Sequence, residues 1–583
     1  MLETEAVEMM FWPNLVVARF LKHLEVATKL QPSPPLHQRH QKCSETSLSL
    51  IPKRPCSSII RLQSKDLTMN RLPAELLSSI ITDVLPKHDI WDPLPCSARA
   101  IYACVSRRWQ SIVESHTFKT ISLHSDELPY FIQLLDDSPH RRRALKILQY
   151  TVNLPRCSER QRHHYENSQE MRENNIIFTR AVYRLFLTLN RWDKDDYMPI
   201  RLSLEIESPS DVPSARWIDS RLEFVPIAEC GNTLVNVKRI TNIHIATDGY
   251  RDIHPATSIK LMAALPMLVR VTCWLTQPQS MWEEERRKHR HVLARGLEAS
   301  HFSALKVLSL DDSYDDPKNH SFHPGILDEP STSTMDSLNT VLHKISQTIP
   351  LTRLYLGSRW IVSPELFWPT ENRPRPFWPT LTHLRVKASI VTPDGRYYYT
   401  GDDSLHMASS PELEDSENLP SDGPSPSDIS IHINNRHEMQ RRARLNGDLP
   451  DHPWRDRLDA EVFNPLMLSI SRAVLQMPAI KQLRVYFGTL PTSLIGGWYT
   501  SIECLGPGHK TDPLLYVTDA KREKETIEEQ QRIRRFKVWL GKNLRGWSPT
   551  MEMMSLWREF AGEDGIARVE RESSEWWYPD QVL

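Results

Sequence analysis

The chain has 583 residues, more than one compact core accommodates, which excludes a single small domain. Its 72 Lys and Arg residues balance 73 Asp and Glu residues, so the formal net charge is −1 and composition does not favour a general polyanion-binding role. Hydrophobic residues make up 40% of the chain, which excludes wholesale disorder.

Cysteine usage and hydropathy predict the compartment. No two of the 8 Cys residues are spaced as CxxC, which in a chain of this length indicates reduced thiols. No apolar run reaches the ~20 residues that span a bilayer. Acidic residues precede the short apolar patch at 9–18, where a signal peptide would carry positive charge. We therefore expect an intracellular protein, cytoplasmic and/or nuclear, with no membrane partner.

Residues 1–68 have the composition of a disordered N-terminal extension. Prolines at 32, 34, 35, 52 and 55 are spread among Ser, Gln and Lys, as is typical of linkers. Met69 stands immediately before the first strongly patterned segment. We expect the folded part of the chain to begin there.

Residues 69–123 carry the pattern of a small helical module. Pro73 and Glu75 suit the first turn of a helix, where a missing N–H costs nothing and an acid is favoured. A second helix is expected over 100–113. One apolar stripe can pack on that helix, which leaves the other facing outward as a partner site. The two stripes are Leu72, Leu76, Ile80 and Val84, and Leu77, Ile81 and Leu85.

This segment resembles the F-box, specifically that of large fungal proteins with leucine-rich-like C-terminal regions. The resemblance rests on Leu72-Pro73-x-Glu75-Leu76, on Ile80 and Leu85, on Val105-Ser106-Arg107-Arg108-Trp109, and on the strand with Phe118 and Ile121. In that family the Leu-Pro start and the apolar helix faces bind the Skp-type adaptor of a cullin–RING ubiquitin ligase. The resemblance implies that six residues face this adaptor or hold the module together: Leu72, Pro73, Leu76, Ile80, Val105 and Trp109.

The sequence departs from the F-box pattern at 89–95, which lengthens the usual short connection between the helices. A second interpretation also stays open. Leu, Ile and Trp at helical spacing are usually core residues, so the same segment fits an ordinary helical hairpin that caps the repeats described next.

An apolar-x-x-apolar-x-apolar repeat runs through the rest of the chain. Its last two positions are two residues apart and therefore point to one face of a strand. Helical patterns precede several copies, as at 259–265, 335–349 and 462–477. For 124–583 we expect an irregular leucine-rich-repeat-like α/β solenoid that binds substrate. The copies begin at Phe118, Leu145, Ile240, Leu268, Leu305, Leu351, Leu381 and Ile480.

Residues 402–451 interrupt this pattern with clustered acids and prolines. Such a composition predicts a disordered acidic insertion. The overall fold class expected is therefore α+β or α/β, with a small helical F-box module followed by the irregular solenoid.

Four local clusters have the residue types of metal or nucleic-acid sites but lack the spacing that such sites need. His163-His164 and His289-Arg290-His291 offer no HxxxH or CxxC, so we expect surface positions and no metal. The basic runs 141–143 and 286–288 lack the interleaved aromatics of single-strand binders, so we expect solvated helix faces and no nucleic acid.

The function expected is that of a substrate-recognition adaptor in an SCF-type cullin–RING ubiquitin ligase. Its partners are then a Skp-type adaptor, the cullin–RING ligase and a protein substrate. No catalytic residue, cofactor or metal is expected, because none of the motifs GxxxxGK[ST], GxGxxG, GxSxG or HExxH occurs. Two alternatives stay open: an F-box-like scaffold unrelated to ubiquitin, and an enzyme with an unrecognised active site.

Overall fold

The computed structural model describes residues 73–84, 102–193, 198–207, 220–227, 233–246, 251–327, 336–369, 375–406, 436–487, 500–509, 533–541 and 546–571. The extension 1–68 that the sequence predicts lies outside these residues. The chain divides into two compact units, 1–123 with 129–146, and 124–128 with 147–583. Each unit is described separately.

The described part of the first unit is helical, with one strand. It contains α2 (Ala74–Val84), α4 (Arg107–Thr117) and α6 (Pro139–Ala144). The strand β1 (Thr120–His124) and the helix α5 (Leu128–Asp136) have residues in both units. A short 3-10 turn, Ser125–Glu127, stands between them.

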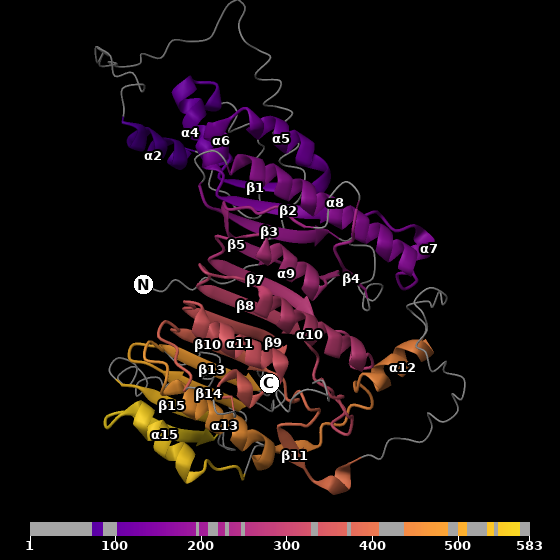
Figure 1. Cartoon of the computed structure of the whole chain (residues 1–583), viewed down its shortest axis with the longest axis vertical. Coiled ribbons are helices and arrows are strands. Elements are labelled where there is room, and N and C mark those ends of the chain that lie inside the picture. The colour runs from indigo at the N-terminus through magenta and orange to yellow at the C-terminus, as the bar shows by residue number, and fades with distance from the viewer. Residues whose placement is uncertain are drawn as a thin grey trace, which may run out of the picture. The chain divides into compact units, whose positions relative to one another are not determined.

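The second unit is built on a large, mostly parallel sheet whose strands run in the order β2-β3-β5-β7-β8-β9-β10-β13-β14-β15-β16 (Figure 1). Each strand from β2 to β13 is parallel to its neighbour, whereas β13–β14 and β14–β15 are antiparallel and β15–β16 is parallel. The chain is thus a mixed α/β protein. The strands are β2 (Ile147–Asn153), β3 (Ile200–Glu207), β5 (Ile240–Ile245), β7 (Arg270–Thr276), β8 (Val307–Ser313), β9 (Arg353–Trp360), β10 (His383–Ala388), β13 (Gln482–Phe487), β14 (Thr500–Leu505), β15 (Arg535–Leu540) and β16 (Ile566–Arg571).

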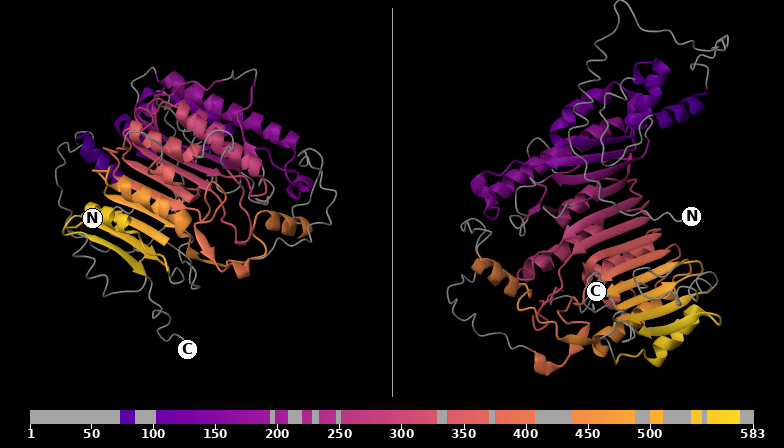
Figure 2. Two further views of the ribbon diagram at one scale, coloured as in Figure 1. Left: turned by 60° about the horizontal axis from the view of Figure 1, so that its bottom comes forward. Right: turned by 180° about the vertical axis from the view of Figure 1, so that it is seen from behind.

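The long helices cover one face of this sheet. They lie in front of the strands in Figure 1, and the view from behind in Figure 2 shows the strands in front. These helices are α8 (Ser168–Trp192), α9 (Pro255–Ala263), α10 (Glu283–Ala299), α11 (Ser337–Thr348), α13 (Ala460–Val474) and α15 (Met551–Ala561). The remaining short elements are α7 (Glu159–Arg162), η4 (Pro364–Leu366), η5 (Asp403–Leu405), α12 (Arg436–Leu445) and the strand pairs β4 (Arg221–Leu222) with β6 (Asp252–Ile253) and β11 (Tyr399–Gly401) with β12 (Arg455–Leu458).

The core lies between the sheet and these helices. In β8, Leu308, Leu310 and Asp312 are buried, and the residues between them are half-buried. Two hydrogen bonds show which face the buried set occupies. Tyr150 Oη of β2 donates to the Ala181 carbonyl of α8 (3.1 Å), and His289 of α10 lies 3.1 Å from Asp312. The alternating residues therefore point to the opposite face, because the side-chain period of a strand is two. The six long helices do not pack on this face, and we call it the open face.

Each copy of the predicted repeat contains a strand, and the copies of the second unit share one register. Leu384 of β10 pairs with Leu354 of β9 and Leu483 of β13, and Leu308 of β8 also pairs with Leu354. Leu354 and Leu356 are buried, and Arg353 is exposed. The predicted orientation of this strand is confirmed.

Strand β3, which stands between β2 and β5, was not predicted. Leu202 and Leu204 of β3 pair with Leu148 and Tyr150 of β2, so they occupy the same positions as the other copies. Pro199 replaces the apolar residue that begins the repeat, which hid this copy.

The limits 402–451 for a disordered acidic insertion were too wide. Residues 436–445 form α12, and the chain after this helix forms hydrogen bonds with the rest of the second unit. The Met281 N–H donates to Asn446 Oδ1 (3.0 Å), and the Asn319 N–H donates to the Gly447 carbonyl (2.8 Å). Arg442 lies over the Tyr165 ring, 4.3 Å from its centroid. These contacts come from residues far away in sequence, which composition alone does not reveal.

Candidate functional site

Helix α2 has one buried and one exposed apolar face. Leu77 is 0% exposed, whereas its neighbour Leu76 is 54% exposed. Ile81 is buried with Leu77, Ile80 is half-buried and Pro73 is exposed. Leu72, also predicted to face a partner, lies outside the described residues. Among the described side chains of the two stripes, Leu77 and Ile81 are therefore in the core, whereas Leu76 is exposed and Ile80 is half-buried.

The buried face of α2 packs on α4. Leu77 and Ile81 form an apolar cluster with Trp109 and Val113, and Tyr102 stacks beside Trp109 with ring centroids 6.3 Å apart. Trp109 is 6% exposed. Of the two roles that the resemblance implies for this residue, the geometry gives Trp109 the one of holding the module together.

The expected helix over 100–113 was wrong in its limits. Ser106 has an extended backbone and caps α4, because its Oγ accepts a hydrogen bond from the Trp109 N–H (3.3 Å). The turn just before this cap brings Val105 to the surface, where its side chain is 59% exposed. Val105 and Leu76 are therefore large apolar side chains of the first unit that face solvent.

A buried carboxylate ties α4 to the end of the first unit. Glu114 lies 2.7 Å from Arg141 Nη2 and 2.7 Å from His140 Nε2. Burial opposes the ionisation of Glu114, but hydrogen bonds from Arg141, His140 and Gln110 hold its pKa below the ordinary value. Arg142 is also buried and donates to the Leu135 carbonyl (2.8 Å). The prediction of a solvated face for 141–143 was therefore wrong at Arg141 and Arg142, because these cations satisfy acceptors inside the unit, whereas Arg143 is exposed.

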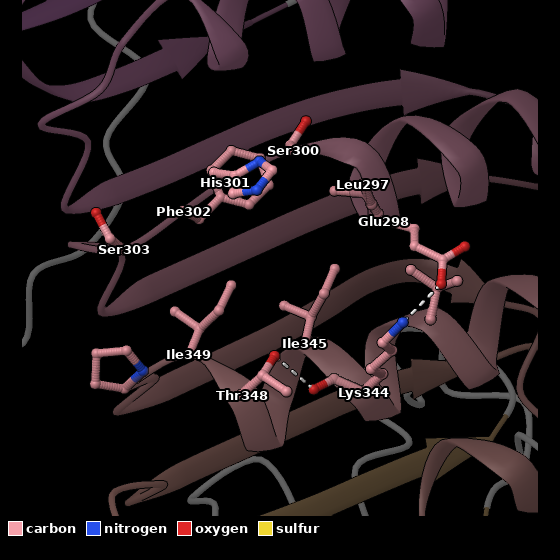
Figure 3. A pocket seen from close by; sticks show the side chains of 12 residues that line it. Leu297, Glu298, Ser300, His301, Phe302, Ser303, Lys344, Ile345, Thr348 and Ile349 are labelled. Atoms are coloured by element: carbon pink, nitrogen blue, oxygen red, sulfur yellow. Dashed lines mark hydrogen bonds and ion pairs between the residues drawn. The ribbon is translucent and has the colours of Figure 1, made fainter.

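A hollow of about 410 Å³ lies in the second unit between the C-terminal ends of α10 and α11 (Figure 3). Apolar side chains such as Leu297, Phe302 and Ile345 form its wall. Lys344 Nζ and Glu298 Oε1 form an ion pair of 2.8 Å at its rim. The lining contains His301 but no nucleophile and base within hydrogen-bond distance of each other, so it offers no catalytic constellation.

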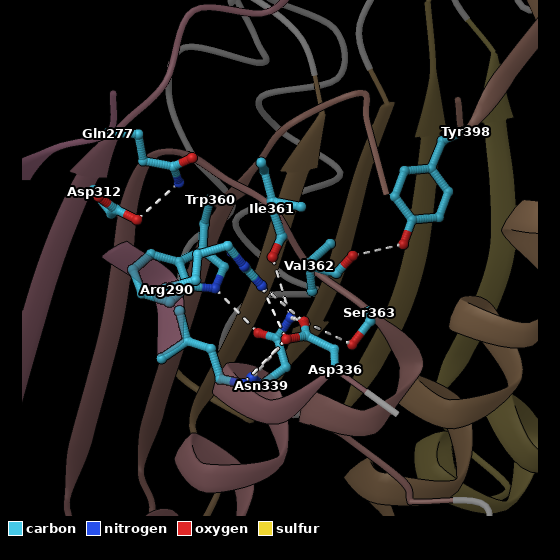
Figure 4. A network of polar contacts seen from close by, with 11 residues as sticks. Gln277, Arg290, Asp312, Asp336, Asn339, Trp360, Ile361, Val362, Ser363 and Tyr398 are labelled. Atoms are coloured by element: carbon cyan, nitrogen blue, oxygen red, sulfur yellow. Dashed lines mark hydrogen bonds and ion pairs between the residues drawn. The ribbon is translucent and has the colours of Figure 1, made fainter. Parts of the chain in front are cut away.

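Polar side chains are concentrated beneath the carboxyl ends of β8 and β9 (Figure 4). Arg290 contacts Asp336, Asp336 contacts Asn339 and Ser363, and Trp360 Nε1 donates to Asn339 Oδ1 (3.1 Å). All of these side chains are buried. Since each carboxylate or amide is occupied by protein partners, this network stabilises the fold and leaves no substrate position.

The expectation of surface positions for His289-Arg290-His291 and for 286–288 was wrong at His289, Arg290 and Arg286, which are buried. Asp312 lies within hydrogen-bond distance of His289 and also accepts a hydrogen bond from Gln277 Nε2 (2.7 Å). Burial raises the pKa of Asp312, but His289, Arg290 and Gln277 reverse that effect and leave it below the ordinary value. The groups that His289, Arg290 and Arg286 contact, namely Asp312, Asp336 and the Pro324 carbonyl, are distant in sequence, which explains the error.

Cys273 is a buried free thiol. Burial raises the pKa of Cys273 to about 12, so its thiol is not a thiolate nucleophile at neutral pH. Among the side chains that the structure describes, no group of three or more His, Cys, Asp or Glu is arranged to hold a metal ion. Within the same residues, no helix combines the length and apolar character needed to cross a bilayer.

No protein-family model, curated protein or solved structure matches this chain. The candidate site therefore rests on its own geometry. That geometry is a small helical unit with the exposed apolar residues Leu76 and Val105, in a chain whose second unit is a long sheet with one open face.

Proposed function

We propose that this protein is the substrate-recognition adaptor of an SCF-type cullin–RING ubiquitin ligase. In this proposal the first unit contains an F-box module that binds a Skp-type adaptor. The second unit is an irregular leucine-rich-repeat-like solenoid that binds a protein substrate. Catalysis belongs to other subunits, and ubiquitin transfer is promoted because tethering raises the effective concentration of the substrate.

One observation carries the proposal for the first unit. Leu76 and Leu77 are adjacent and equally apolar, but only Leu77 has a partner surface among the described residues of its own unit. Leu76 and Val105 are both exposed in a unit with a small core, which favours a protein partner that covers apolar side chains of this unit. The F-box resemblance supplies the identity of that partner.

The repeat register supports the proposal for the second unit. Neighbouring copies pair leucine to leucine along parallel strands, and the six long helices that the structure describes pack on the same face. A strand–helix unit of this kind buries its apolar face by stacking on the next copy. The open face that results is long enough to bind an extended partner.

Adaptor binding tests this function. The purified full-length chain is titrated with a recombinant Skp-type adaptor, and binding is measured by calorimetry. Leu76→Ala combined with Val105→Ala is expected to weaken binding by about 1–4 kcal/mol, as central apolar anchors do. Met551→Ala is the matched control, because Met551 is 91% exposed but lies in the second unit.

The proposal fails if the wild-type chain does not bind the adaptor. It also fails if the Met551→Ala control loses as much affinity as the double variant. Adaptor binding without recruitment of a cullin subunit would instead favour the scaffold unrelated to ubiquitin.

A further inference from the structure

The open face of the second unit carries a row of positive charge where its strands begin. Arg270 of β7 and Arg353 of β9 both pair in register with Val307 of β8, and His383 of β10 pairs with Arg353. Lys306 and Lys481 directly precede β8 and β13 and are exposed. We name Arg270, Lys306, Arg353 and Lys481 the basic stripe.

Arg270 and Arg353 of this row point away from the helices, whereas Lys306 and Lys481 add exposed charge just before their strands begin. Val271, Leu354 and Leu384 are buried on the helix side of the sheet. Arg270, Arg353 and His383 stand one residue earlier on the same strands and therefore face the open side. Arg353 is exposed and Arg270 is half-buried, so a partner can reach both guanidinium groups.

Acids are absent from the same positions of the parallel strands, although Glu503 of the antiparallel β14 forms an ion pair with Arg484 of β13 (3.0 Å). In the parallel strands from β2 to β13, neither of the first two open-face positions is Asp or Glu; acids appear on this face only further along, as at Glu205 and Asp311. The first of these positions are Ile147, Arg201, Asn242, Arg270, Val307, Arg353, His383 and Gln482, and the second are Gln149, Ser203, His244, Thr272, Ser309, Tyr355, Arg385 and Arg484.

The stripe is also not neutralised within the described part of the chain. None of its four cations forms an ion pair with a described carboxylate, in contrast to Arg290, Arg141 or Lys344. The pKa of His383 reflects its burial and the positive charge around it. Burial, and then the positive charges of Arg353, His509, Lys481 and Arg484, lower the pKa of His383 to about 4. Unneutralised charge of one sign on a protein surface favours a ligand of the opposite sign.

The spacing fits a short extended segment. Adjacent strands are about 4.8 Å apart, so the four steps from β7 to β13 span roughly 19 Å. An extended peptide rises about 3.3 Å per residue, which makes this span about six residues long. The half-buried aromatic rings of Trp274 and Tyr355 lie further along β7 and β9 on the same face, where they can contact apolar side chains of such a segment.

We propose that the basic stripe binds an acidic or phosphorylated segment of a protein partner. This inference rests on the proposed function, because it names the substrate class that the second unit recognises. A protein segment is favoured over nucleic acid for two reasons. The whole chain has a formal net charge of −1, which gives no long-range attraction for a polyanion. The stripe is also only about six peptide residues long.

Peptide binding to the full-length chain tests the inference. Three fluorescent peptides of about eight residues are compared by anisotropy: one rich in Glu, one with phosphoserine at the same positions, and one with Gln. The test variant is Arg270→Gln with Arg353→Gln. The matched control is Arg172→Gln with Arg295→Gln, which removes the same charge from exposed positions of α8 and α10. Thermal unfolding checks that both variants fold.

The expected result is that an anionic peptide binds the wild type and binds the stripe variant at least tenfold more weakly, while the control variant keeps its affinity. Affinity should also fall as salt increases. Tighter binding of the phosphoserine peptide than of the Glu peptide would assign the charge to phosphate groups, and the reverse would assign it to carboxylates.

Three results would overturn the inference: no binding of either anionic peptide, equal losses in the stripe and control variants, or tighter binding of an oligothymidylate through the same two arginines. Failure here is separable from failure of the proposed function. Adaptor binding involves the first unit and needs no peptide, so either experiment can succeed alone.

Discussion

Nη2 of Arg290 lies 2.9 Å from each carboxylate oxygen of Asp336, and both side chains are buried. Asp336 is also the N-cap of α11, where Oδ1 accepts a hydrogen bond from the Leu338 N–H (3.1 Å). The pair therefore fixes the start of α11 to the inner side of α10. A polar contact between successive helices performs the role here that apolar side chains perform elsewhere in the core.

Replacing Arg290 tests how much this contact contributes to the free energy of unfolding. Arg290→Met keeps most of the side-chain volume but leaves the Asp336 carboxylate buried without its cation. We expect a loss of about 3–5 kcal/mol in the free energy of unfolding, measured by urea denaturation. Arg295→Met is the control on the same helix, because Arg295 is exposed; its effect should stay within about 0.5 kcal/mol. Equal losses in the two variants would contradict a structural role for the pair.

The sequence predicts the strands of the second unit better than its polar interior. The pattern ending in Leu354 and Leu356 identifies β9 and its buried face, because alternation alone determines which side chains share a side. His289 and Arg290 were misplaced for a different reason. Their partners Asp312 and Asp336 are 23 and 46 residues further along the chain, and no local pattern reveals such pairs.

The sequence pattern is also incomplete for the first unit and for the end of the sheet. Four-residue spacing identifies two stripes on α2, but only the structure shows that Leu77 is buried and Leu76 exposed. β14 and β15 were not predicted, because they run antiparallel after β13 and lie outside the repeat. Their residues are almost all buried on both faces, so they also lack the alternation that marks the earlier strands.

The register of β9 gives a second prediction. Leu354 is 2% exposed, so Leu354→Asp places a carboxylate in an apolar layer and should cost about 3 kcal/mol or more. Tyr355 is half-buried on the open face, so Tyr355→Asp should be much milder. Because each copy leans on its neighbours, hydrogen exchange should show lost protection first in β8 and β10. Equal tolerance of Asp at both positions would refute the register on which the proposed substrate surface depends.

A third prediction separates folding from binding in the first unit. Leu77→Ala removes a buried side chain from the cluster with Trp109 and should cost about 2–5 kcal/mol, seen as faster amide exchange in α4. Leu76→Ala removes an exposed side chain and should leave that exchange rate unchanged. If Leu76→Ala speeds exchange as much as Leu77→Ala does, the Leu76 face belongs to the core and is no partner surface.

The last prediction concerns acid sensitivity. Nδ1 of His320 accepts a hydrogen bond from the Arg455 N–H (3.1 Å), so the ring is neutral in the fold. Burial, and then the charges of Arg455 and His452, lower the pKa of His320 from 6.5 to about 4. The unfolded chain thus takes up this proton first as the pH falls. The stability that His320 contributes is fully present above pH 6.5 and is lost as the pH drops towards 4. At pH 5 the loss amounts to about 2 kcal/mol for this one group.

The stability of the His320→Gln variant should therefore depend less on pH than that of the wild type between pH 7 and pH 5, when urea midpoints are compared. His254 and His383, whose pKa values also lie near 4, remain in both proteins and cancel in that comparison. The exposed His301 provides the control, since His301→Gln should leave the slope of the wild type intact. Parallel pH profiles for wild type and His320→Gln would show that this ring titrates freely in the folded protein.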